Sequence, residues 1–160
     1  MTTTTTARKI LLIANEIVDD AALDDAILTY GDVEVVVVAP ALNTRFRHWT
    51  SDEDRARRQA AARLQACVAT LDTTSSRVRG WVGDADPICA IADALVFFEA
   101  DELVVATAPE HRSNWLAQDV VARAGTRFEL PVTEIVVEEG DARGAAPASR
   151  LQHHAVPAAS

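Results

Sequence analysis

The fold of this chain is decided by residues 76–105, SRVRGWVGDADPICAIADALVFFEADELVV. Its first part, residues 77–82, alternates polar and apolar side chains, which is typical of a half-buried strand. Asp86 and Pro87 then predict a helix start, because Asp accepts from free N–H groups of the first turn and Pro needs no partner there. Apolar residues follow at helical spacing: Ile88, Ile91, Leu95 and Phe98. Residues 102–106 close the stretch as an apolar strand, so it predicts a βαβ unit with two parallel strands.

The same kinds of pattern extend this unit in both directions. They predict further strands at residues 8–14, 33–39 and 132–137, and further helices at about 20–30, 51–71 and 115–128. The second of these helices has an apolar face made of Ala60, Leu64, Cys67, Val68 and Leu71. We therefore expect one α/β domain over residues 8–138, between a disordered leader at residues 1–7 and a flexible tail at residues 139–160.

The composition of each strand predicts its place in the sheet. The strands at 8–14, 33–39 and 102–106 are apolar almost throughout, as interior strands are. The other two carry polar side chains that suit an edge. With right-handed crossovers, this predicts a doubly wound parallel sheet in the order 3-2-1-4-5 with helices on both faces. Ligands of such a sheet bind at the carboxyl ends of the strands where the order reverses, here between the first and fourth strands.

The composition excludes some classes of function. The chain has 160 residues, 49% of them hydrophobic, and a net charge of −9, which opposes sequence-independent binding to nucleic acid or to an anionic membrane. Two cysteines do not make a disulfide framework, and the start of the chain lacks the apolar run of a signal peptide. We therefore expect a cytoplasmic protein with no nucleic-acid or membrane partner.

Candidate ligand-binding residues follow the strand ends. Arg45, Arg47 and His48 lie after the second strand, and His111 and Arg112 lie after the fourth. Together these two loops can hold a phosphate or a carboxylate; the alternative is that their side chains are solvated and do not converge. The full candidate set is Ala14, Asn15, Glu16, Pro40, Gly83, Asp84, Thr107, His111, Arg112, Ser113 and Asn114.

The chain resembles the universal stress protein family over roughly residues 9–137. The resemblance is carried by residues 10–14 (ILLIA), 83–87 (GDADP), 101–107 (DELVVAT) and 130–132 (LPV). It implies the five-stranded fold predicted above, a homodimer formed through the fifth strand and, in many members, bound ATP. The implied dimer-interface residues are Val132, Thr133, Glu134, Ile135 and Val136.

The family's ATP-binding motif is the part of the pattern that this chain lacks. In the family, G-x-x-G follows the fourth strand and a G-[S/T] pair comes nine residues later, because glycine lets backbone N–H groups approach phosphates. Here residues 106–115 (ATAPEHRSNW) contain no glycine, and Gln118 and Asp119 stand near the place of the second pair. Asn15 matches the family's Asp at the end of the first strand. The resemblance thus implies a divergent member, in which any ATP is held without the usual motif.

Several single residues have packing interpretations beside functional ones. A helix N-terminus stabilises a thiolate at Cys89, but we expect a buried structural cysteine. Trp81 and Trp115 can stack on a base or pack in the core, and Trp49 can serve as a lid or a partner contact. We expect no metal site at residues 153–154, because two adjacent histidines point apart and lack a second ligand pair.

Catalytic motifs are absent from the sequence, which has no nucleophile elbow, no P-loop lysine and no paired metal ligands. A receiver-domain pocket is excluded because it needs a strand-end lysine, and Lys9 is the only lysine. Three hypotheses remain: a binding or regulatory protein that holds a small anionic ligand or nucleotide, an interaction module of the same fold that dimerises without a nucleotide, and a weak nucleotide hydrolase.

Overall fold

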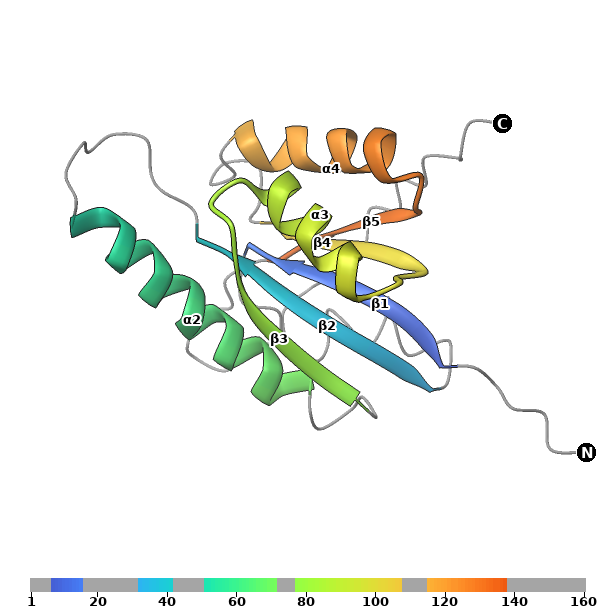
Figure 1. The fold of residues 1–160 in the computed structure, drawn as a ribbon, viewed down its shortest axis with the longest axis horizontal. Coiled ribbons are helices and arrows are strands. Elements are labelled where there is room, and N and C mark those ends of the chain that lie inside the picture. Colours follow the sequence, from blue (N-terminus) through green and yellow to red (C-terminus); the bar gives the residue numbers. More distant parts are fainter. Residues whose placement is uncertain (1–6, 16–31, 42–50, 72–76, 108–114, 138–160) are drawn as a thin grey trace, which may run out of the picture.

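The computed structural model describes residues 7–15, 32–41, 51–71, 77–107 and 115–137. Its elements, in chain order, are β1 (Arg8–Ala14), β2 (Val33–Pro40), α2 (Ser51–Leu71), β3 (Arg77–Gly83), α3 (Pro87–Phe97), β4 (Glu102–Thr107), α4 (Trp115–Phe128) and β5 (Val132–Val136) (Figure 1). All five predicted strands are confirmed, with ends that agree to within one residue. The helix expected at about 20–30, the tail expected at 139–160 and all of the leader expected at 1–7 except Ala7 lie outside the described residues.

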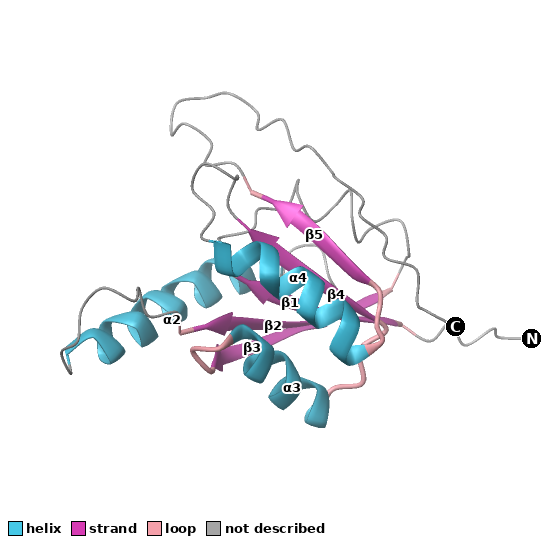
Figure 2. Cartoon of the chain, turned by 90° about the horizontal axis from the view of Figure 1, so that it is seen from above, coloured by secondary structure: helices cyan, strands magenta, loops and turns pink. Residues whose placement is uncertain are grey.

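The strands form one parallel sheet in the order β3-β2-β1-β4-β5, which confirms the predicted topology. β1 lies in the middle and pairs with β2 on one side and with β4 on the other. In Figure 2 the strand arrowheads point toward the same end of the sheet, so the carboxyl ends of the strands share one edge. β3 and β5 are the edge strands, as their mixed composition predicts.

Helices cover both faces of the sheet. α2 lies on one face, and α3 and α4 lie together on the other (Figure 1). Because side chains alternate along a strand, Ile10 and Leu12 pack on the α2 side, whereas Leu11 and Ile13 pack on the side of α3 and α4. Within the described ranges, none of the helices is both long and apolar enough to cross a membrane.

α2 packs closely on the sheet because Gly80 of β3 has no side chain. A Cβ atom at Gly80 would lie 2.4 Å from the carbonyl oxygen of Val37 and 2.6 Å from a methyl carbon of Leu64. Cys67 and Leu71 are buried in the core on this face, with Leu64 beside them. The apolar face predicted for this helix is therefore confirmed.

α3 begins as the sequence predicts. Asp86 is its N-cap, and the Asp86 carboxylate accepts a hydrogen bond from the amide of Ile88 at 2.8 Å. Pro87 occupies the first turn, where it leaves no donor unsatisfied. The cap at Asp86 and the proline after it thus start the helix at the place that the sequence predicts.

The inner face of α3 corrects one expectation. Its buried residues are Ile88, Ala90, Ile91 and Ala94, and Leu95 is only partly buried. The expectation of a buried Cys89 is wrong, because its side chain is exposed. Successive helical residues turn by about 100°, so position 89 falls opposite the inner face.

Candidate functional site

The carboxyl ends of the strands bring several candidate residues to one edge of the sheet. These are Ala14, Asn15, Pro40, Gly83, Asp84 and Thr107. Asn15 directly follows β1 and is half-buried, and its backbone N–H donates to the carbonyl oxygen of Ile13 at 3.2 Å. The remaining candidates lie outside the described residues, namely Glu16, His111, Arg112, Ser113 and Asn114, together with the basic loop residues Arg45, Arg47 and His48.

An arginine of α2 also reaches this edge. The Arg63 guanidinium donates from one terminal nitrogen to the carbonyl oxygen of Pro40, the last residue of β2, at 2.7 Å. The side chain is half-buried. Sequence reasoning missed Arg63, although its position in the helix, between Ala60 and Leu64 at the border of the apolar face, was the available signal. It places a positive charge beside the strand ends.

A carboxylate lies at the other side of the edge. The hydroxyl of Thr107, the last residue of β4, donates to a carboxylate oxygen of Glu134 at 2.8 Å. Thr107 is only 1% exposed, so this bond holds the carboxylate in a fixed place next to the end of β4. Since the hydroxyl proton is used in this bond, Thr107 has no donor left for a ligand. The Thr107–Glu134 pair therefore offers the carboxylate as an acceptor and offers no hydroxyl donor.

Groups of opposite charge therefore lie beside the carboxyl ends of the strands. A guanidinium lies at the end of β2, an amide follows β1, and a carboxylate lies across β4 and β5. A phosphate is attracted to the first of these groups and repelled by the last. Hydroxyl groups of a sugar can donate to the last. Arg63 comes from α2, whereas Glu134 lies with Val132 on the face of the sheet that α3 and α4 cover, so the two charges approach the strand ends from opposite faces.

The N-terminus of α3 is occupied by the protein's own carboxylates. Asp86 caps the helix, and the carboxylate of Asp84 accepts from the amide of Asp86 at 2.8 Å. These bonds satisfy N–H groups that a phosphate would otherwise use. Asp84 therefore supports the turn, and α3 does not offer an anion site.

Gly83, another candidate, is required by packing. A Cβ atom there would lie 2.7 Å from a methyl carbon of Val38 and 2.8 Å from the Cβ of Ala90. The carbonyl oxygen of Gly83 also accepts from the amide of Ala41 at 3.3 Å, which joins the ends of β2 and β3. Close contact between α3 and β2 accounts for this glycine without a ligand.

The predicted dimer strand uses most of its side chains within the protomer. Val132 and Ile135 are buried in the core. The Thr133 hydroxyl donates to Glu102 at 2.6 Å, and Glu134 accepts from Thr107. Within the described ranges no strand lies beyond β5, so its outer backbone edge and the half-buried Val136 are the parts that the predicted dimer would use.

The tryptophans and the histidine pair at residues 153–154 were the remaining candidates. Trp81 is partly buried and packs against the core beneath α3 and α4, which supports its packing interpretation. Trp49 and residues 153–154 lie outside the described residues, and nothing is described of the Trp115 side chain. Within the described part of the chain, no group of three or more His, Cys, Asp or Glu side chains can hold a metal ion.

A scan against protein-family models found no matching family, and a search of curated proteins found no match.

Proposed function

We propose that this chain is a binding or regulatory protein, similar to universal stress proteins, that holds a small ligand in the crevice between the carboxyl ends of β1 and β4. The observation that carries the proposal is the reversal of strand order at β1, which pairs with β2 on one side and with β4 on the other. Crossovers leave such a point in opposite directions, and the crevice between them is where doubly wound sheets bind ligands.

The groups along the edge favour a nucleotide or a similar hydroxylated anion. Arg63 supplies a cation, Asn15 an amide and Glu134 an acceptor. The capped N-terminus of α3 and the absence of glycine from residues 106–115 leave the phosphates to side chains. In this proposal Arg63, with His111 and Arg112 of the loop after β4, takes the place of the family's glycine-rich loop.

The test is a calorimetric titration of the full chain with ATP and magnesium. We expect saturable binding with a Kd in the micromolar range, about −8 kcal/mol. Arg63→Gln should weaken it by about tenfold, because a guanidinium–phosphate bond is charge-assisted. Arg57→Gln removes the same charge from an exposed site on α2 and should leave the Kd unchanged. Absence of saturable heat, with the protein folded by circular dichroism, would reject the nucleotide proposal.

A second candidate is an interaction module of the same fold that dimerises without a nucleotide. The fixed carboxylate of Glu134 favours it, because a negative charge at the crevice opposes phosphate. The outer edge of β5, with which none of the described strands pairs, provides its means of association. A weak nucleotide hydrolase is the third interpretation, and release of phosphate from ATP would distinguish it from both.

A further inference from the structure

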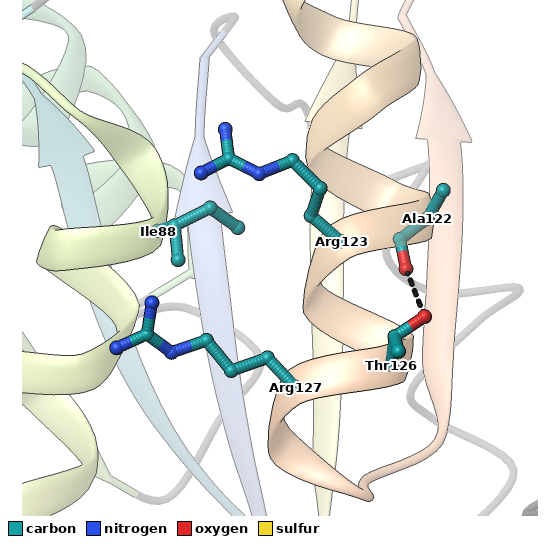
Figure 3. A pocket seen from close by; sticks show the side chains of 5 residues that line it. All are labelled: Ile88, Ala122, Arg123, Thr126 and Arg127. Carbon is teal, nitrogen blue, oxygen red and sulfur yellow. Dashed lines mark hydrogen bonds between the residues drawn. The ribbon is translucent and has the colours of Figure 1, made fainter.

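A groove of about 360 Å³ lies between α3 and α4. It is lined by Ile88, Ala122, Arg123, Thr126 and Arg127 (Figure 3). Ile88 is 1% exposed and belongs to the core, so it gives the groove an apolar floor. The volume falls at the lower end of the roughly 300–1,000 Å³ typical of small-molecule sites.

Two arginines border this groove. Arg123 and Arg127 are four residues apart and therefore lie on the same face of α4. Figure 3 shows both side chains extending from α4 across the groove toward Ile88 of α3. Two positive charges thus lie above one apolar floor in a chain whose net charge is −9.

The protein itself neutralises these charges only weakly. One nitrogen of Arg123 lies 3.6 Å from a carboxylate oxygen of Asp119, but both side chains are about half exposed, and such pairs contribute little. The Arg127 guanidinium lies 5.7 Å from the ring centre of Phe128. Among the described residues, Arg127 has no carboxylate within ion-pair distance. Both guanidinium groups therefore retain donors for an anion.

We propose that this groove binds a small organic phosphate monoester, with the phosphate held by Arg123 and Arg127 and the organic part resting on Ile88. A phosphate offers three strong acceptor oxygens and can engage both guanidinium groups, whereas a single carboxylate has two oxygens and matches one. The Thr126 hydroxyl donates to the carbonyl oxygen of Ala122 at 3.0 Å, so the donors for the ligand are the guanidinium groups. The site thus recognises a class of ligands through charge and one apolar contact.

The experiment is an amide-resolved NMR titration of the full chain with phenyl phosphate at low ionic strength. We expect saturable shifts at Ile88, Arg123 and Arg127, with a Kd below about 1 mM. Benzoate, which has one carboxylate, should bind several-fold more weakly. Shifts confined to Asn15 and Thr107 would place the phosphate in the strand-end crevice and would overturn this proposal without affecting the proposed function.

Two double variants that remove the same charge from different places test whether the groove, and not the overall charge of the protein, binds the phosphate. Arg123→Gln with Arg127→Gln should raise the Kd by at least about tenfold. Arg57→Gln with Arg58→Gln removes the same charge from α2 and should change it by less than about twofold. Glutamine has nearly the helix propensity of arginine, so both proteins should fold, and their amide spectra verify this. Equal loss in the two variants, or no saturation in the unaltered chain, would contradict the site.

Discussion

At the scale of single residues, Gly83 and Asp86 show how local chemistry shapes the strand ends. Gly83 ends β3 and lets α3 approach β2, since a Cβ would meet Val38 and Ala90 at under 3 Å. Asp86 begins α3 and takes up its first free amide. Gly83 is one of the candidate ligand-binding residues and Asp86 is the predicted helix cap, and the contacts described for both lie within the fold.

The first prediction concerns Gly83. Gly83→Ala should lower the free energy of unfolding by about 1–3 kcal/mol, because the added methyl overpacks the contact with Val38 and Ala90. Urea denaturation measures the change. The control is Gly125→Ala in α4, where a Cβ would meet only Val132, at 3.8 Å. That change should stabilise the protein by up to about 1 kcal/mol, since glycine disfavours a helix. Equal effects at the two sites would contradict the packing account of Gly83.

At the scale of elements, Glu102 joins three strands. One of its carboxylate oxygens accepts from Arg8 of β1 at 2.7 Å, and the other accepts from Thr133 of β5 at 2.6 Å. Its side chain is 10% exposed, so water screens these contacts poorly. The carboxylate thus fixes β4 between its two neighbours on the α2 face of the sheet.

The second prediction follows from this network. Glu102→Gln should lower the free energy of unfolding by about 1–3 kcal/mol, because it removes the charge that both hydrogen bonds use. Glu34→Gln is the control, since Glu34 pairs with Arg79 at 3.4 Å and the arginine side chain is 60% exposed. That pair should contribute less than about 1 kcal/mol. If urea denaturation gave the same loss for both variants, the network across β4 would not stabilise the sheet.

At the scale of the whole molecule, β5 is the edge strand that lies nearer to the proposed crevice between β1 and β4. The amide of Val137 donates to Thr107 of β4 at 2.8 Å. Because amides alternate in direction along a strand, the amide of Val136 points away from β4. Among the described residues no strand pairs with this side of β5, which is the side that the proposed dimer uses.

The third prediction concerns this edge. Light scattering at about 50 µM, where weak dimers form, should give twice the 17.2 kDa of the chain. Val136→Pro should give the monomer mass, because it removes the outward amide and leaves the bonds to β4 intact. Val136→Thr keeps the amide and should remain a dimer. A dimer that survives Val136→Pro would point to another surface, such as Val96 and Phe97 on α3, which are 75% and 81% exposed.

Sequence reasoning succeeded for the features that are set by residues close together in the chain. Apolar runs predicted the interior strands, because the central residues of a strand covered on both faces are buried. Polar residues on β3 and β5 predicted the edges. The N-cap at Asp86 was predictable because capping involves only neighbouring residues. These signals were enough for the strand order, since right-handed crossovers leave few alternatives.

The sequence by itself therefore determined the elements, their order in the sheet and the edge where the strands end. Only the tertiary structure decided that Arg63 reaches Pro40 and that Thr107 holds Glu134. It also decided that the two arginines of α4 face Ile88 across a groove. The physical reason is that periodicity records which face of an element is apolar. The partner of a polar side chain depends instead on how elements distant in sequence are packed together.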